Sequence, residues 1–311
     1  MKKMLCSLLA VMMMVVCLSG CGSSDAGSDN YVVGVVQLMV HDALDQSTKG
    51  FQDSLTAELE AKGKTVEFDV QVAGEPNLCT TVVNTFTSKN VDLIMANATP
   101  SLLAAANATT SIPVLGTSVT DYDDTFKGSI PENVSGTSDA VPFDQQAQMM
   151  IDTLGLEKGD LVGVLFCTNE SNSLIQYEAV KKLFDAEGIT AKAYTFSETT
   201  ELQTVVTSMA NEVKAVFIPS DNTVSANDAI VGTICTDNNV PVYTSYGGAI
   251  GYASLAINYY DLGVETGKMA AQVLLGEKAV SDIEIKTLTP TVVYNNELCE
   301  KLGIEVPEEY K

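Results

Sequence analysis

The loop at residues 219–223, PSDNT, places one acidic side chain where a buried strand gives way to a helix. Residues 215–218 form a short apolar run typical of an inner strand of a parallel sheet, and Pro219 ends it because proline lacks an N–H donor. Asp221 and Asn222 then stand at the start of the next helix. Ligands of open α/β sheets bind beyond the carboxyl ends of the strands. Asp221 is therefore a candidate ligand-binding residue, with helix capping as its alternative role.

Hydroxyl and amide side chains follow other predicted strands at corners of the same kind. A ligand that carries an anionic group needs hydrogen-bond donors at such corners. Because the chain contains no arginine, those donors must be hydroxyls and backbone N–H groups at helix starts. Three clusters meet this need, each with helix capping as the alternative: Thr99 with Ser101, Ser118 with Thr120, and Ser171 with Asn172 and Ser173.

The loop after the first predicted strand supplies a candidate pocket for an apolar ligand side chain. Gln37 opens this loop, and Leu38 and Leu44 form an apolar wall, although both leucines also suit an ordinary core. Tyr122 and Tyr246 could stack on an aromatic ring. Burying such a ring contributes about 4 to 6 kcal/mol before ordering costs.

Motifs for catalysis, cofactors and metals are missing from the sequence. His41 is the only histidine, and it suits either the cleft mouth or a solvated loop. The chain has no GxSxG, GxGxxG, GxxxxGK[ST] or CxxC pattern, so hydrolytic triads, dinucleotide or P-loop chemistry and clustered metal ligands are disfavoured. We expect a binding protein with no enzyme activity, cofactor or metal.

The first 21 residues predict export and lipid anchoring. Lys2 and Lys3 precede an apolar run at residues 4–18, and the closing tetrapeptide LSGC resembles the bacterial lipobox, in which the cysteine is acylated. Cys21 is then the lipidated first residue of the mature chain, and residues 22–30 form a flexible tether. A plain secretory peptide is the alternative. The predicted location is the extracytoplasmic face of the bacterial cell membrane.

Composition indicates a folded, acidic protein that does not bind nucleic acid. Hydrophobic residues make up 46% of the chain and charged residues only 18%, which is ample for sizeable cores. The formal charge is −23, and it becomes −25 once Lys2 and Lys3 are removed with the signal. An acidic body repels nucleic acid and anionic lipid headgroups, so the lipid alone holds the protein at the membrane.

Alternating β-branched runs and amphipathic segments predict an α/β fold with two doubly wound parallel-sheet lobes joined by three crossovers. The expected N-terminal lobe comprises residues 31–138 plus 247–276, and the C-terminal lobe residues 139–246 plus 277–311. Gly247 and Gly248 provide backbone freedom for a crossover between the lobes, although a simple loop explains them equally well.

Six ordered motifs resemble the ABC-transporter substrate-binding lipoproteins of the tryptophan and tyrosine uptake group: VGVVQ at 33–37, HDALD at 41–45, ATPS at 98–101, TSVTD at 117–121, PSDNT at 219–223 and NYYDLG at 258–263. The resemblance covers the whole mature chain. It implies the type I periplasmic-binding fold and a monomer that captures a small molecule between its lobes and delivers it to a membrane permease. An aromatic amino acid is the favoured ligand. Asp221 is then the candidate counter-ion of its ammonium group, and the three hydroxyl and amide clusters, with N–H groups at helix starts, are the candidates to hold its carboxylate.

Other functions remain open at this point. A nucleoside or sugar binder of the same fold is weakened by the lack of tryptophan and arginine, because such ligands usually require flat aromatic platforms and forked polar contacts. A sensor subunit that presents its ligand to a receptor kinase would have the same sequence features. An exported enzyme is disfavoured because no catalytic constellation is visible.

Overall fold

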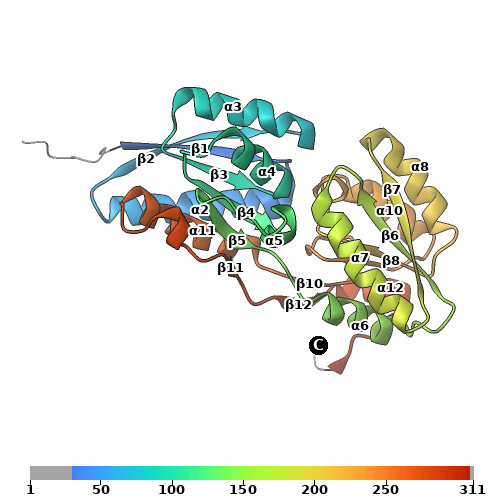
Figure 1. Cartoon of the computed structure of the whole chain (residues 1–311). Helices are drawn as coiled ribbons and strands as arrows, with labels where there is room; N and C mark the ends of the chain where they lie inside the picture. Colours follow the sequence, from blue (N-terminus) through green and yellow to red (C-terminus); the bar gives the residue numbers. More distant parts are fainter. Residues whose placement is uncertain (1–29, 309–311) are drawn as a thin grey trace, which may run out of the picture.

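A computed structural model describes residues 30–308, which divide between two six-stranded sheets (Figure 1). The strand order is β11-β5-β4-β3-β1-β2 in the first sheet and β12-β10-β9-β8-β6-β7 in the second. All neighbouring strands are parallel except β12, which runs antiparallel to β10. The expected two parallel-sheet lobes are confirmed. The predicted signal segment, with Cys21, lies outside the described residues.

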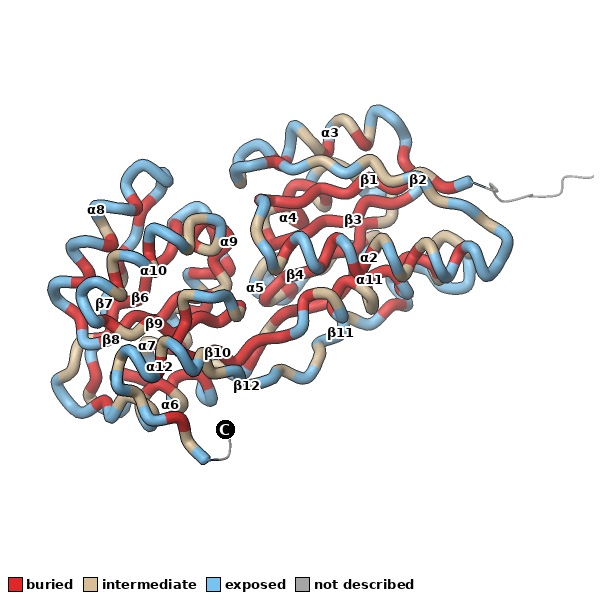
Figure 2. The backbone as a smooth tube through the Cα atoms, turned by 180° about the vertical axis from the view of Figure 1, so that it is seen from behind, coloured by how far each residue is buried: buried red, intermediate tan, exposed pale blue. Residues whose placement is uncertain are grey.

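The strands of the first sheet are β1 (Asn30–Gln37), β2 (Thr65–Val72), β3 (Leu93–Asn97), β4 (Val114–Val119), β5 (Val134–Ser138) and β11 (Lys286–Thr287). Those of the second sheet are β6 (Leu161–Cys167), β7 (Thr190–Phe196), β8 (Ala215–Ile218), β9 (Val242–Thr244), β10 (Ala253–Ala256) and β12 (Thr291–Tyr294). Every residue of the inner strands β3, β4, β8 and β9 is buried, whereas the edge strand β2 has exposed positions throughout (Figure 2). Continuous apolar runs are therefore confined to strands covered on both faces.

Helices cover both faces of each sheet (Figure 1). On the first sheet, α3 (Cys79–Lys89) and α4 (Thr99–Ala108) pack on one face, and α2 (Asp42–Glu60) and α11 (Tyr259–Leu274) pack on the other. On the second, α6 (Phe143–Leu154), α7 (Ser171–Ala186) and α12 (Asn296–Leu302) lie opposite α8 (Thr199–Ala210) and α10 (Asp228–Asp237). Two short helices, α5 (Tyr122–Thr125) and α9 (Asn222–Ser225), follow β4 and β8. None of these described helices is long and apolar enough to cross a membrane.

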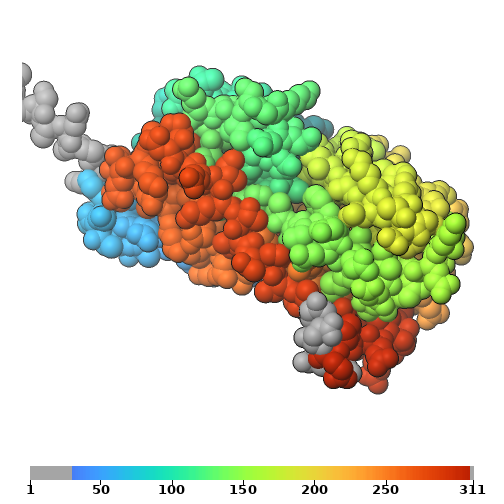
Figure 3. Space-filling view, turned by 60° about the horizontal axis from the view of Figure 1, so that its bottom comes forward, coloured from blue at the N-terminus to red at the C-terminus, as the bar shows by residue number. Residues whose placement is uncertain are grey.

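The chain passes between the lobes three times, but two of the passages differ from those expected. The first lies between β5 and α6. The second follows β10, not Gly247 and Gly248, because those glycines adopt φ of +84° and +91° in a loop that returns the chain to the same sheet beside β9. The third follows β11, not residue 277, because the two-residue strand β11 pairs with β5 and is too short to be recognised in the sequence. In Figure 3 the segment that follows α11 runs across the surface of both lobes.

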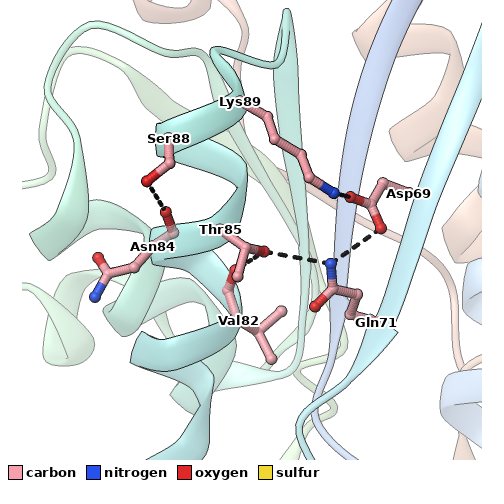
Figure 4. A network of polar contacts seen from close by, with 7 residues as sticks. All are labelled: Asp69, Gln71, Val82, Asn84, Thr85, Ser88 and Lys89. Carbon is pink, nitrogen blue, oxygen red and sulfur yellow. Dashed lines mark hydrogen bonds and ion pairs between the residues drawn. The ribbon is translucent and has the colours of Figure 1, made fainter.

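A polar network attaches α3 to the edge strand β2 (Figure 4). Lys89 Nζ lies 2.6 Å from Asp69 Oδ2, while Gln71 donates to Asp69 Oδ1 at 3.0 Å and to Thr85 Oγ1 at 3.3 Å. The exposed ion pair contributes little by itself, so the main effect of the network is to fix the position of α3 on the edge strand.

After the second passage the chain re-enters the first lobe as α11, which packs closely against α2. A Cβ atom added to Gly263 of α11 would lie 2.0 Å from the carbonyl oxygen of Ser47 in α2. A Cβ atom added to Gly50 of α2 would lie 2.1 Å from the carbonyl oxygen of Tyr260 in α11. Only glycine allows the two helix backbones to approach this closely. The pair of helices therefore holds the start of α11, which leads directly from β10, in a fixed position.

We expect Gly263→Ala to lower the free energy of unfolding by about 1 to 3 kcal/mol or more, because the new methyl group meets backbone atoms that have no rotamer to change. Urea unfolding followed by circular dichroism measures the effect. Lys268→Ala on the same helix removes only an exposed ion pair with Glu265 and should cost less than about 1 kcal/mol. Equal stability of the two variants would contradict the close-contact argument.

Candidate functional site

Side chains from both lobes surround a small cavity beyond the carboxyl ends of the two sheets. The lining residues are His41, Ala43, Leu44, Ser118, Asp139 and Tyr259 from the first lobe and its crossovers, and Ser220, Asp221, Asn222, Ser225 and Tyr246 from the second. Five residues predicted from the sequence are among them: Leu44, Ser118, Asp221, Asn222 and Tyr246. The cavity has a volume of about 10 Å³, room for about one water molecule.

Asp221 lies at this cavity with its carboxylate tied to the second lobe. Its side chain is buried, Oδ1 accepts the backbone N–H of Val224 at 2.9 Å, and Oδ2 accepts the N–H of Cys167 at 2.8 Å and the hydroxyl of Ser173 at 2.7 Å. Burial and the nearby carboxylate of Glu170 raise the pKa of Asp221 well above its usual value. The capping role is therefore visible in the contacts, whereas a contact with a ligand ammonium group stays a prediction.

Glu170 is a second buried carboxylate, and the sequence patterns did not point to it. Its two oxygens accept the backbone N–H groups of Asn222 at 3.0 Å and Thr223 at 2.8 Å, together with the Asn222 amide at 2.6 Å and the Thr223 hydroxyl at 2.7 Å. Glu170 thereby holds the first turn of α9 and orients Asn222. Glu170 stands immediately before α7. Its position beside the predicted helix-start residues 171–173 is the sequence feature that could have identified it as a site residue.

His41 connects the two lobes. One ring nitrogen, Nε2, lies 3.2 Å from Asn222 Oδ1 and the other, Nδ1, lies 3.3 Å from Ser225 Oγ. Because the Asn222 amide group already donates to Glu170, its oxygen faces His41, and Nε2 is the ring donor. Of the two positions left open by the sequence, the structure shows the cleft and not a solvated loop. A second contact between the lobes joins Gln176 Nε2 to Thr120 Oγ1 at 3.5 Å.

Strained backbone occurs at the first-lobe side of the cleft. Ala98 and Ser118 have φ of +88° and +55°, which non-glycine residues rarely adopt. Ser118 lies within the irregular part of β4 between Gly116 and Val119, and its hydroxyl lies 3.0 Å from that of Ser47. Strained backbone conformations often occur at functional sites, where they give a side chain a direction that regular secondary structure would not allow.

Two predicted residues have buried oxygen atoms without a hydrogen-bond partner in the described part of the chain. These atoms are Thr99 Oγ1, at the first turn of α4, and Asn172 Oδ1, at the first turn of α7. Asn172 also donates from its amide nitrogen to the carbonyl oxygen of Ser220 at 2.8 Å. Buried polar atoms are normally satisfied, so both oxygens are available to a polar group or to water.

The other predicted residues do not line the central cavity. Both ends of the Gln37 amide are used within the first lobe, by Met39, Asp45 and Thr48, and Leu38 is fully buried in the core. Ser173 is used by Asp221, Ser101 lies 3.6 Å from the thiol of Cys79, and Ser171 is exposed. Tyr122 also lies inside the first lobe, where its hydroxyl points at the carbonyl oxygen of Thr137 at 3.2 Å, so it offers no stacking surface there.

Asp139 and Tyr259 also line the cavity, although neither was predicted as a ligand contact; Tyr259 appeared only within the motif at 258–263. Each stands at a passage between the lobes: Asp139 directly follows β5, and Tyr259 begins α11 after β10. The rule that ligands lie beyond the carboxyl ends of strands would have pointed to Asp139 had β5 been recognised as a strand.

Two larger hollows also lie between the lobes. One, of about 350 Å³, is lined by Met39 and residues 75–77 of the first lobe and by Cys167, Asn169, residues 197–199 and Thr223 of the second. The other, of about 920 Å³, shares His41, Tyr246 and Tyr259 with the central cavity and extends along residues 256–260. Ligand pockets commonly measure roughly 300 to 1,000 Å³, so the space between the lobes reaches that size only outside the central cavity.

The fold and the interlobe site are those of a solute-binding protein, and sequence comparison agrees. The chain belongs to the ABC transporter substrate binding protein family, whose profile matches residues 32–310. A tyrosine-binding protein of Clostridioides difficile (strain R20291) is 31% identical over 316 residues, covering 95% of this chain and 90% of that protein.

Two solved structures share 31% identity with the chain but fit it unequally. An ABC domain in complex with L-Trp from Streptococcus pneumoniae superposes with a TM-score of 0.83, covering 90% of this chain and 97% of that one. The ligand-free, open structure of a Clostridium difficile substrate-binding protein with adhesive properties gives 0.64, covering 89% and 96%. When two lobes rotate relative to each other, the TM-score of the whole chain falls even though the structure of each lobe is unchanged. The lobes here are therefore arranged more as in the L-Trp complex than as in the open structure.

We expect acidification to separate the lobes. Burial lowers the pKa of His41 from its usual 6.5, despite the opposing effects of its bond to Asn222 and of Glu170, Asp45 and Asp42. Separation exposes the ring and restores the ordinary value, so protonation favours the separated form. The contribution of neutral His41 to the free energy of closure is therefore fully present above about pH 6.5. It is lost as the pH falls below 6.5 towards the lowered pKa of the buried ring.

Small-angle X-ray scattering checks this expectation, with a larger radius of gyration at pH 5 than at pH 8. In His41→Gln, which keeps a hydrogen-bonding side chain but cannot titrate in this range, the increase should be small. An equal increase in the variant and the unmodified protein would show that another group controls the change.

Proposed function

We propose that the protein captures an aromatic L-amino acid between its lobes and delivers it, chemically unchanged, to an ABC permease in the membrane. The main support is the polar cavity formed by both lobes at the carboxyl ends of their sheets, in a chain similar to a tyrosine-binding protein and to a protein solved with L-Trp. Neither the sequence nor this cavity favours a nucleoside, a sugar or a catalysed reaction.

In this proposal different residues bind the carboxylate, the ammonium group and the aromatic ring of the ligand. The ligand carboxylate is held by hydroxyl and amide donors because the site offers no arginine; Ser118 and Asn222 of the cavity are candidates, and so is Thr99, which does not line the cavity but has a buried hydroxyl without a partner. Leu44 and Tyr246 contact the aromatic ring. Two buried carboxylates, Asp221 and Asp139, are candidates for the ammonium group.

Binding requires the lobes to move. The central cavity is smaller than an amino acid, and it is closed by weak contacts such as the one between Gln176 and Thr120. Separation of the lobes widens the cavity and breaks these contacts, and closure around the ligand replaces them with contacts that the ligand makes to both lobes. The permease then meets a form whose shape reports whether ligand is bound.

The purified chain without residues 1–21 should be stabilised by tyrosine, tryptophan or phenylalanine, and not by sugars or nucleosides. At a ligand concentration 100 times Kd the stabilisation is about 2.7 kcal/mol, which raises Tm by roughly 4 to 5 °C for a chain of this length. A thermal-shift screen identifies the ligand and calorimetry confirms one site. Recovery of the ligand unchanged separates binding from catalysis, and stabilisation by sugars alone would overturn the proposal.

We also propose that Cys21 carries the lipid anchor, which the sequence ending LSGC supports. In a bacterial host, Cys21→Ser should abolish incorporation of labelled palmitate and move the protein from the membrane fraction to the soluble fraction, because the anchor has no acceptor thiol. Cys17→Ser is the matched control within the same segment and should leave both results unchanged. Labelling that persists in Cys21→Ser would contradict the proposed anchor.

A further inference from the structure

The buried carboxylate of Asp139 occupies a special place between the lobes. Its backbone N–H continues the pairing of β5 by donating to the carbonyl oxygen of Val119 at 3.1 Å, so the residue is fixed at the end of the first sheet. From there the chain passes into the second lobe. The side chain is only 5% exposed and faces the central cavity.

One oxygen of this carboxylate has a partner and the other has none. The hydroxyl of Tyr259 donates to Oδ2 at 2.9 Å, whereas Oδ1 has no hydrogen-bond partner among residues 30–308. Burial raises the pKa of Asp139. The hydrogen bond from Tyr259 opposes that rise, as do the Thr120 hydroxyl and the backbone N–H of Asp139 itself, neither of which has the geometry of a hydrogen bond to Oδ1. A buried carboxylate with an open oxygen is costly unless another donor completes it.

The other buried carboxylates of the site are already satisfied. Glu170 accepts four close hydrogen bonds from Asn222 and Thr223, and Asp221 accepts three from its own lobe. Asp139 alone combines burial, a position on the cavity and an oxygen without a donor.

The charges around the cavity define what can complete this oxygen. Among its lining residues the titratable side chains are His41, Asp139, Asp221, Tyr246 and Tyr259, and none of them is a lysine. An anionic group beside Asp139 would be repelled by its carboxylate, whereas a primary ammonium group supplies three N–H donors and a positive charge. Water is the remaining candidate, and it differs from an ammonium group in having no net charge with which to neutralise the carboxylate.

We propose that Asp139 is the counter-ion of the ammonium group of the bound amino acid and that Tyr259 is the positioning residue that holds its carboxylate. This inference rests on the proposed function and replaces Asp221 in the role expected from the sequence. Because the two residues stand at two of the passages between the lobes, the charged end of the ligand lies against the connecting segments and not at the outer mouth of the cleft.

The test compares the aromatic amino acid that binds the unmodified chain most tightly with its analogue lacking the amino group, for example 3-(4-hydroxyphenyl)propanoate in place of tyrosine. Asp139→Asn preserves shape and should weaken binding of the amino acid by about 30-fold or more, while the affinity for the analogue changes little. Calorimetry measures both, so the readout is the ratio of the two affinities, which a general structural defect would not alter selectively.

Two further aspartates provide matched comparisons. Asp228→Asn alters a similar pair, in which the hydroxyl of Tyr246 donates to Asp228 at 2.6 Å, and it should leave the ratio unchanged. Asp221→Asn should lower Tm because three donors lose their acceptor charge. Loss of amine selectivity in Asp221→Asn but not in Asp139→Asn would overturn the inference and return the role to Asp221.

The remaining outcomes are also decisive. Unchanged affinities in Asp139→Asn would show that solvent satisfies the open oxygen, and the inference would be wrong although the proposed function stands. If the unmodified chain binds no aromatic amino acid, the proposed function itself fails. Should Asp139→Asn not fold, Tyr259→Phe keeps the charge but removes its donor: it should weaken binding of the amino acid more than binding of the analogue, and an equal loss for both would overturn the inference.

Discussion

The site depends on placing three carboxylates, Asp139, Glu170 and Asp221, in the interior without a cationic side chain to neutralise them. None of the ion pairs within residues 30–308 involves these groups, and the chain has no arginine that could reach them. Backbone N–H groups and hydroxyls must therefore supply the stabilisation. Such donors are concentrated at the carboxyl ends of parallel strands and at the first turns of the following helices, which is where the three carboxylates lie.

This requirement connects the cleft to the helix starts of the second lobe. Glu170 and Asp221 share the donors of α9 and its flanking residues, so the first turn of that helix is held from both sides. Asn222 projects from this turn to His41 of the first lobe. A contact between lobes is thus built on a carboxylate network that belongs to one lobe alone, and it can break without disturbing that network.

The connecting segments are held firmly in their lobes, whereas the contacts across the cleft are weak. Glycines bring α2 and α11 into backbone contact, which anchors the second passage firmly in the first lobe. Across the cleft the lobes are joined through His41 and Gln176 by bonds of 3.2 to 3.5 Å, and hydrogen bonds of this kind contribute only about 1 kcal/mol each. Rigid lobes with a weakly held interface suit a protein that must open to admit its ligand and close again around it.

The sequence by itself determined the two parallel-sheet lobes, the family resemblance and five of the cavity residues, because strand periodicity, helix starts and the position of ligands beyond strand ends are local or topological rules. It pointed to Asp221, whose carboxylate oxygens are both occupied, and missed Asp139, which has one open oxygen, because β5 was not recognised as a strand and hydrogen-bond satisfaction is not visible in a sequence. It also missed the short strand β11 and the loop that keeps Gly247 and Gly248 in the second lobe. Only the tertiary structure decided these points, because hydrogen-bond satisfaction and strand pairing depend on partners brought together from distant parts of the chain.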